Sequence, residues 1–304
     1  MVSVDSQIDN IHTSLLRALD KWRCNPNAEV KLISLSENAV FKISNPETGS
    51  SLIIRVHRDN YNSRAEILSE IQWIRALKKD TRLKIVTPIS SKNGSWLESI
   101  DSGNLAVAFE YIAGRPLTGG DYNESIFYKI GMTAAILHQQ CQSWNFPADF
   151  IRKSWSFENS FGSHSIWGDW RQAPGLTAET KIFLGTVINS IRKHLTMFGN
   201  NINNFGLIHG DMKLANLIIS GNSIHLLDFD DCGLNWFLYD YGCAMTDIGA
   251  GLLTEQLTCA WCEGYRSVRA LTEEEISMLP IFHLIRRILT MAWSGSHSDS
   301  PIAK

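Results

Sequence analysis

The stretch from Leu207 to Asp231 reads LIHGDMKLANLIISGNSIHLLDFDD, and it concentrates the polar residues to which a chemical role can be assigned. Two short apolar runs, 217–220 and 223–227, are separated by Gly221-Asn222. This dipeptide suits the turn of a two-residue β-hairpin, and the flanking runs have the length of short strands. The stretch therefore predicts a hairpin preceded by a polar loop.

The register of this hairpin places two polar side chains at its open end. If Ser220 faces Ser223 across the turn, Asn216 and Asp228 both lie just beyond the paired residues. Opposed Cα atoms in antiparallel ladders are about 4.5 to 5.5 Å apart, so an amide oxygen and a carboxylate can converge there on one cation. Oxygen ligands of this kind suit magnesium.

Asp211 lies in the polar loop, after the apolar, strand-like run 205–208 and shortly before Asn216. We expect its carboxylate beside the same cation. A carboxylate in that place can orient a substrate hydroxyl and accept its proton, while the metal offsets charge on a transferring phosphoryl group. The arrangement favours phosphoryl transfer.

Bulk composition narrows the class of protein. A chain of 304 residues exceeds a single small core and predicts two lobes. With 44% hydrophobic residues, 19% charged residues and a net charge of −3, neither a disordered tail nor a nucleic-acid partner is expected. The sequence shows no apolar run near the ~20 residues of a membrane span and no signal-peptide pattern at its start, so we expect no membrane partner and a cytoplasmic location.

Six cysteines would be reduced in that compartment, and disulfides are not expected. Cys259 and Cys262 form a lone C-x-x-C without a second pair or two suitably spaced histidines, so we interpret them as helix-packing residues.

The rest of the chain predicts a small antiparallel sheet followed by a helix-rich part. The expected elements are an amphipathic helix over 8–22, strands 30–35, 39–43 and 51–56, a helix over 62–79, a strand over 105–112, and helices over 124–140 and 178–198. Glycines and a proline in AGRPLTGGD mark a hinge after residue 112. We therefore expect an N-terminal helix and nucleotide-binding lobe over 1–112 and a catalytic, substrate-binding lobe over 113–304. The tryptophan-rich stretch 155–174 is either packing, which we favour, or part of a substrate pocket.

One run of residues resembles a known family. His209-Gly210-Asp211, four further residues, Asn216, and Asp-Phe-Asp at 228–230 resemble the aminoglycoside phosphotransferase family, as does DCGLNWFLYDYG at 231–242. The resemblance covers roughly residues 34–265. It implies an α+β, bilobal, protein-kinase-like fold, with an antiparallel sheet plus helix in the N-lobe and a mainly helical C-lobe.

The resemblance implies a role for each matching residue. Asp211 would be the catalytic base, Asn216 and Asp228 the magnesium ligands, and Asp240 a buried anchor that holds the catalytic loop. We expect His209, which precedes the base, to orient the loop by hydrogen bonding rather than to bind metal.

Other polar residues near the motif keep two interpretations. Asp230 and Asp231 either face a cationic or hydroxyl-rich substrate or belong to a solvated loop. Lys213 either reaches the transferred phosphate, as the matching lysine does in protein kinases, or is a solvated loop lysine. His138, in the periodic helix over 124–140, is expected to be a packed residue.

The N-lobe departs from the kinase pattern on its third strand. Kinase-like enzymes place there a lysine that pairs with a helix glutamate. Here SLIIRVHR offers Arg55, which we pair with Glu70 and expect to hold the nucleotide phosphates. The alternative is an ordinary surface salt bridge.

No G-x-G-x-x-G motif is present, and the corresponding stretch reads LSENAVFK. Its Ser36, Glu37 and Asn38 suit a small capping turn, in which Asn38 either contacts the nucleotide or is purely structural. By family analogy, the backbone at Glu110 and Ile112 would contact the adenine.

The resemblance and the motif together favour transfer of the γ-phosphoryl group of ATP, with Mg²⁺, to a hydroxyl of a compact small molecule that is cationic or sugar-like. A protein Ser/Thr kinase of the same fold, with a protein substrate, is the first alternative. A nucleotide-binding scaffold without turnover is the second, suggested by Arg55 and the missing glycine loop. Intact Asp211, Asn216 and Asp228 argue against the scaffold.

Overall fold

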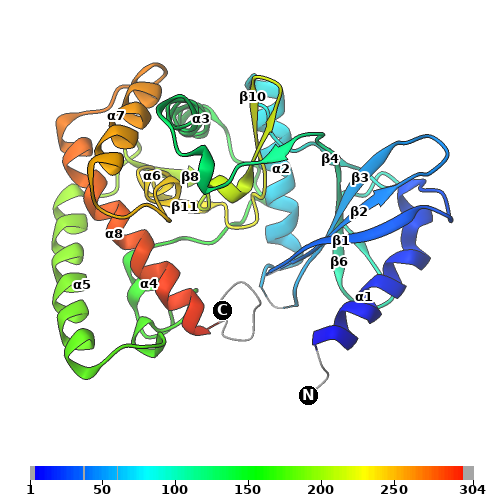
Figure 1. The fold of residues 1–304 in the computed structure, drawn as a ribbon, viewed down its shortest axis with the longest axis horizontal. Helices are drawn as coiled ribbons and strands as arrows, with labels where there is room; N and C mark the ends of the chain where they lie inside the picture. Colours follow the sequence, from blue (N-terminus) through cyan, green and yellow to red (C-terminus); the bar gives the residue numbers. More distant parts are fainter. Residues whose placement is uncertain (1–3, 37, 60, 297–304) are drawn as a thin grey trace. The chain divides into compact units, whose positions relative to one another are not determined.

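The computed structural model describes residues 4–36, 38–59 and 61–296 of the chain (Figure 1). The chain divides into two compact units, unit 1 with residues 1–114 and 147–151, and unit 2 with residues 115–146 and 152–304. Residues 147–151, which the sequence placed in the second lobe, belong to unit 1, where the Ile151 amide donates to Ser69 Oγ at 2.9 Å.

Unit 1 is built on an antiparallel sheet of six strands with the order β1-β2-β3-β6-β4, and with β5 also paired to β6. The strands are β1 (Glu29–Leu35), β2 (Ala39–Ser44), β3 (Ser51–Val56), β4 (Pro88–Ile89), β5 (Glu98–Ser99) and β6 (Leu105–Glu110). Helix α2 (Arg64–Asp80) follows β3 and begins with a capping box, in which the Glu66 amide donates to Ser63 Oγ and the Ser63 amide to Glu66 Oε2. The predicted meander and helix are confirmed.

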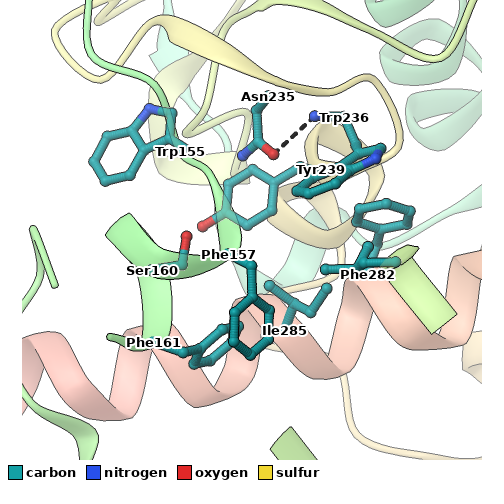
Figure 2. Close-up of a pocket in the computed structure, with 10 residues that line it drawn as sticks. Trp155, Phe157, Ser160, Phe161, Asn235, Trp236, Tyr239, Phe282 and Ile285 are labelled. Carbon is teal, nitrogen blue, oxygen red and sulfur yellow. Dashed lines mark hydrogen bonds between the residues drawn. The ribbon is translucent and has the colours of Figure 1, made fainter. Parts of the chain in front are cut away.

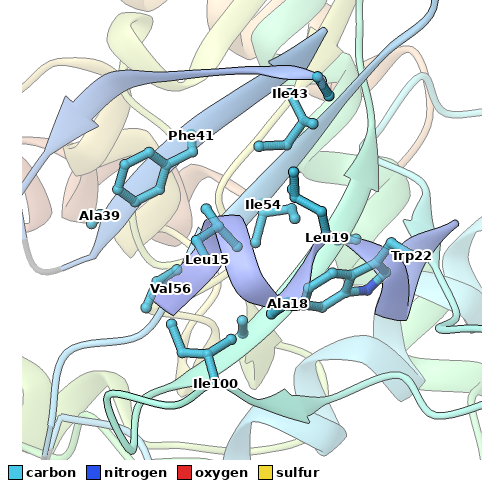
Figure 3. Packing of buried hydrophobic residues seen from close by; sticks show 13 residues of the cluster. Leu15, Ala18, Leu19, Trp22, Ala39, Phe41, Ile43, Ile54, Val56 and Ile100 are labelled. Carbon is cyan, nitrogen blue, oxygen red and sulfur yellow. The ribbon is translucent and has the colours of Figure 1, made fainter. Parts of the chain in front are cut away.

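The N-terminal helix covers one face of this sheet. Helix α1 (Val4–Ala18) continues into the 3₁₀ turn η1 (Leu19–Trp22). Their apolar side chains pack against the buried, alternating residues of β2 and β3 (Figure 3). Because Arg55 lies between Ile54 and Val56, which face α1, strand alternation points Arg55 to the opposite face.

Unit 2 contains a pair of helices in unusually close contact, α3 (Glu124–Ser143) and α7 (Leu252–Arg266). A Cβ built on Gly131 would lie 2.0 Å from the Trp261 carbonyl oxygen, and one on Gly264 would lie 1.9 Å from the Tyr128 carbonyl oxygen. Only glycine permits this approach at either position, so the two backbones can touch.

Unit 2 also contains further helices, 3₁₀ turns and strands. They are β7 (Arg115–Pro116), η2 (Gly119–Asp121), α4 (Phe157–Phe161), η3 (Trp170–Gln172), α5 (Ala178–Phe198), β8 (Phe205–Ile208), η4 (Leu214–Asn216), β9 (Leu217–Ser220), β10 (Ser223–Leu226), β11 (Gly233–Trp236), α6 (Tyr239–Ala244) and α8 (Glu273–Ser296). Small antiparallel sheets are formed by β10-β9-β7 and by β11-β8.

The predicted hairpin register is confirmed. Ser220 pairs with Ser223 and Leu217 with Leu226, so strands β9 and β10 meet as expected. Gly221 has φ 57°, a backbone conformation that glycine adopts at little cost in a tight turn.

Within the described residues, α8 is the helix whose length and hydropathy would suffice to cross a membrane. Of its most apolar window, 44% is buried inside the protein, and Arg286 lies in that buried part. Helices α4, α5 and α8 lie side by side in unit 2 (Figure 1), and α5 and α8 share an aromatic contact between Phe198 and Phe282.

Candidate active site

The loop over 209–216, which the family resemblance predicts to be catalytic, starts where β8 ends. Ile208, the last residue of β8, pairs with Gly233 of β11. Gly210 follows with φ 81°, and a Cβ built there would lie 2.6 Å from the Asp231 carbonyl oxygen. Glycine is therefore required where the loop turns against the 231–233 backbone, immediately before Asp211.

Asp240 lies beneath this loop. Its carboxylate accepts hydrogen bonds from the backbone amides of His209 (3.2 Å) and Gly210 (2.8 Å) and is fully buried. His138 Nε2 lies 3.1 Å from Asp240 Oδ2, and His138 Nδ1 lies 2.9 Å from the Tyr265 hydroxyl. His138, expected only to pack, is buried as expected but also joins the network that holds the loop.

His138 has a definite protonation preference. Burial lowers its pKa, although the neighbouring Asp240 acts to raise it. The imidazole is therefore neutral near pH 7, one ring nitrogen donating and the other accepting. A neutral ring leaves the negative charge of Asp240 for the two backbone amides.

His209 connects the loop to the segment before Asp228. Its Nδ1 accepts from the Asp211 amide at 3.2 Å, so Nε2 carries the proton and donates to the Leu227 carbonyl at 2.8 Å. The edge of the ring also packs on Phe229, with ring centroids 4.6 Å apart. This geometry is that of a side chain that orients the loop.

Asp211 receives hydrogen bonds at both carboxylate oxygens. Oδ2 accepts from Lys213 Nζ at 2.9 Å and from Asn216 Nδ2 at 2.8 Å, while Oδ1 accepts from Arg286 Nη2 at 2.5 Å. Burial acts to raise the pKa of Asp211, but the charges of Lys213 and Arg286 outweigh it and the pKa is lowered. The carboxylate is therefore ionised near neutral pH and available as a proton acceptor.

Lys213 is the cation closest to Asp211 in sequence. Its side chain is 36% exposed, so its ammonium reaches Asp211 while part of the side chain remains in contact with solvent. The charge of Asp211 raises the pKa of Lys213. Lys213 is therefore a partly exposed loop lysine with a specific partner, and its contact with a transferred phosphate stays a prediction.

Asn216 and Asp228 lie at the open end of the hairpin. The Leu227 amide donates to the Asn216 carbonyl at 2.9 Å, which extends the register of β9 and β10 by one residue. Asp228 follows, exposed and with φ 53°, a left-handed conformation uncommon outside glycine. Such strain is concentrated at functional sites, because the surrounding structure has to maintain it.

The donor set suits a hard divalent cation. Within 4–36, 38–59 and 61–296, no group of three or more His, Cys, Asp or Glu side chains is placed to hold a metal ion. Magnesium does not need such a group, since it is commonly bound through one or two protein oxygens together with waters and substrate phosphates. An amide and an exposed carboxylate at one hairpin end fit that pattern.

Asp230 and Asp231 are held through their backbones. Arg152 Nη2 donates to the Asp230 carbonyl at 2.5 Å, and Trp155 Nε1 donates to the Asp231 carbonyl at 3.1 Å. Asp230 is 5% exposed, so the solvated-loop interpretation is wrong for this residue. Asp231 is partly exposed.

Arg286 is the functional candidate that sequence reasoning missed. It lies on α8, is 4% exposed, and contacts Asp211 from 75 positions along the chain. A signal was present, since Arg286 falls between Phe282 and Leu289 at helical spacing and so interrupts an apolar face. A charge on such a face needs a buried partner.

The tryptophan-rich stretch is mainly packing. Trp155, Trp167 and Trp170 are all buried, and Trp155 and Trp167 meet edge to face at 5.4 Å. Figure 2 shows a cavity that Trp155 helps to line, where the Tyr239 ring lies among residues of α4, β11 and α8. Its volume of about 10 Å³ is that of a single water, so it holds no organic acceptor in this conformation.

Unit 1 contributes the expected ion pair. Arg55 Nη2 lies 2.8 and 2.6 Å from the two carboxylate oxygens of Glu70. The side chains are 6% and 0% exposed, so the surface-salt-bridge alternative is wrong. The guanidinium also lies over the Phe109 ring, 5.2 Å from its centroid.

The other residues expected to contact the nucleotide have mainly structural contacts. Asn38 is buried, its Oδ1 accepts from the Arg58 amide at 3.2 Å, and its carbonyl accepts from Ser36. Glu37 lies outside the described residues. At the end of β6, the Glu110 amide donates to the Thr87 carbonyl at 2.8 Å, and Ile112 follows, half-buried.

Comparison with known proteins identifies the family to which this chain belongs. The pattern of the phosphotransferase enzyme family matches residues 29–271. A microcompartment-associated aminopropanol kinase has a similar structure, with 33% identity, a TM-score of 0.88, and coverage of 96% of this chain and 91% of that one.

Two more distant relatives are also kinases. Amicoumacin kinase of Bacillus subtilis (strain 168) is 23% identical over 276 residues, which are 86% of this chain and 78% of the relative. The structure of an amicoumacin kinase in complex with AMP-PNP, Ca²⁺ and amicoumacin aligns with a TM-score of 0.79 and 21% identity, covering 93% and 85% of the two chains.

The protein-kinase-like fold is therefore confirmed, and the chain is a phosphotransferase enzyme. On the extent of the family match and the similarity to aminopropanol kinase, this chain belongs to the phosphotransferase enzyme family.

Proposed function

We propose that the chain transfers the γ-phosphoryl group of ATP to a hydroxyl of a small amino alcohol, with Asp211 as the catalytic base. A bond forms between the acceptor oxygen and the γ-phosphorus, and the bond from that phosphorus to the β,γ-bridging oxygen breaks. The hydroxyl proton passes to Asp211, and ADP leaves.

The observation that carries the proposal is the ionised, buried carboxylate of Asp211 between two cations. Arg286 and Lys213 hold it as an acceptor, and the loop beneath it is fixed by Asp240. Preorganised groups of this kind need no rearrangement when charge moves during the reaction. Lys213, whose ammonium contacts Asp211, would also contact a phosphate oxygen next to the base.

Asn216 and Asp228 would hold a Mg²⁺ ion. When bound, the metal supplies charge stabilisation for the phosphoryl group. The chain's own contribution is to place an amide and a carboxylate at one hairpin end, with Asn216 anchored to Asp211 through its Nδ2. In unit 1, Arg55 would contact the nucleotide phosphates from the face of the sheet opposite α1.

Asp228→Ala is expected to weaken ATP binding in excess Mg²⁺ by about 10- to 100-fold, because it removes a proposed oxygen ligand. Calorimetric titration with and without Mg²⁺ measures the effect, which should vanish when the metal is left out.

Asp228→Asn is the matched control for the backbone, since asparagine tolerates φ 53° and loses only the charge. It should weaken Mg²⁺-dependent binding in the same direction. Unchanged ATP affinity in both variants would exclude Asp228 as a metal ligand.

The amino-alcohol acceptor is supported by the 33% identity to the aminopropanol kinase over nearly the whole chain. The motif and the fold favour a small molecule over a protein substrate.

All six cysteines are free thiols, which supports a cytoplasmic location.

A transfer assay with γ-labelled ATP and Mg²⁺ tests the acceptor class. We expect label on aminopropanol and little on 1,2-propanediol, a matched compound that lacks the amine. Equal labelling of both would exclude the amine requirement. Label on lysate proteins with none on any hydroxyl compound would instead favour the protein-kinase alternative.

A further inference from the structure

Arg286 places a full positive charge inside unit 2. Its side chain is 4% exposed and lies on α8, a helix whose other buried positions are apolar except for Glu275 in its first turn. Arginine stays charged at any accessible pH, and a buried charge costs several kcal/mol unless it is paired and hydrogen-bonded. The partners of Arg286 therefore indicate why the charge is there.

The guanidinium makes hydrogen bonds along its whole edge. Nη2 contacts Asp211 Oδ1 at 2.5 Å, Nε contacts Thr246 Oγ1 at 3.2 Å, and Nη1 lies 3.4 Å from both the Gly210 carbonyl and the Tyr239 hydroxyl. Asp211 and Gly210 belong to the loop that carries the proposed base, Tyr239 is the first residue of α6, and Thr246 lies just after that helix. The group thus joins α8 to the loop that carries the base.

One face of the guanidinium is covered by an aromatic ring. Its central carbon lies 4.8 Å from the centroid of Trp167, which is itself buried. Ser296 Oγ donates to the Trp167 backbone carbonyl at 2.7 Å, so the backbone that carries this indole is tied to the end of the same helix. Stacking and hydrogen bonding together leave the Arg286 head little freedom to rotate.

The two oxygens of Asp211 have different kinds of partner. Oδ2 is bound by Lys213 and Asn216, both from the same short loop. Oδ1 is bound by Arg286, from a rigid helix. A carboxylate held only by its own loop can turn with that loop, whereas one held also by α8 has its plane fixed relative to the unit 2 core.

We propose that Arg286 is a positioning residue, which fixes the plane of the Asp211 carboxylate toward the acceptor hydroxyl and is itself held by Trp167. The inference rests on the proposed role of Asp211 as base. It assigns the C-terminal helix a part in the reaction, although α8 lies outside the catalytic motif.

Arg286→Met is expected to lower kcat by about 10- to 100-fold, the loss typical of a displaced reacting group, with the KM for ATP changed by no more than about twofold. Arg286→Lys keeps the charge without the planar fork, and its kcat should fall by about tenfold. Added guanidinium should restore part of the Arg286→Met activity. The assay uses ATP, Mg²⁺ and the acceptor labelled fastest in the transfer assay above.

Arg287→Met is the matched control, because Arg287 is the next residue of α8 and is exposed. It should leave kcat unchanged. The double variant Asp211→Asn/Arg286→Met separates positioning from general stabilisation, since a residue that acts through Asp211 has no further effect once that carboxylate is removed. Its kcat should fall within about twofold of Asp211→Asn alone.

A parent-like kcat in Arg286→Met would overturn the inference, as would a loss that multiplies in full with that of Asp211→Asn. If Arg286→Met does not fold, Arg286→Lys decides, and parent-like kcat in that variant overturns the inference. An Asp211→Asn variant at the parent rate would instead refute the proposed function itself.

Discussion

Asp211→Asn is expected to lower kcat by about 10² to 10⁴, the contribution typical of a positioned proton acceptor, while ATP affinity changes little. The amide of asparagine is neutral and a very weak base, so it cannot take the proton from the acceptor hydroxyl. Steady-state kinetics with labelled ATP, together with calorimetric titration of ATP, measures the two quantities separately.

The substitution has a local structural cost. Asparagine retains one oxygen and places an NH₂ group at the other position, where it faces a donor from Arg286, Lys213 or Asn216. Opposed donors are unfavourable, so the melting temperature of the variant should be measured together with its kinetics. Asp247→Asn, at an exposed aspartate of unit 2, is the control for loss of one negative charge. Phosphoryl transfer at the parent rate by a folded Asp211→Asn would exclude Asp211 as the base.

Arg55→Met is expected to lower the free energy of unfolding by about 3 to 5 kcal/mol, because it leaves the carboxylate of Glu70 buried without its cation. Both side chains lie on the face of the sheet that α1 does not cover. Urea unfolding followed by tryptophan fluorescence measures the change.

A double-mutant cycle tests the reason for this loss. Arg55→Met/Glu70→Met replaces the pair with apolar groups and should recover most of the stability, since the cost arises from the unpaired charge. Lys21→Met, at the partly exposed pair with Glu98 in the same unit, should change stability by no more than about 1 kcal/mol. An Arg55→Met chain that unfolds at the parent urea concentration would show that the buried pair is not needed for folding.

Arg55 occupies the position at which kinase-like enzymes carry a nucleotide-binding lysine. Here the Nη2 of the arginine donates to both carboxylate oxygens of Glu70. The pair was predicted from the resemblance, but its burial was not. Fifteen positions separate the two residues, and only the packing of α2 on the sheet removes them from water.

The sequence alone determined the local geometry of the motif. The Gly221-Asn222 turn predicted the pairing of Ser220 with Ser223, and Asp211, Lys213 and Asn216 lie so close in the chain that one short loop brings them together. Strand alternation and helical periodicity likewise predicted the meander, α2, β6, α3 and α5, because these patterns report which side chains of one segment share a face.

Tertiary structure decided which distant side chains meet that loop. Arg286 reaches Asp211 across 75 positions, and His138 reaches Asp240 across 102. No periodicity within a segment specifies such a partner, since the meeting depends on how α3, α6 and α8 pack around the loop. Turn chemistry acts between neighbours in the chain and can therefore be predicted from the sequence. The pairing of buried charges depends on distances that exist only once the core has formed.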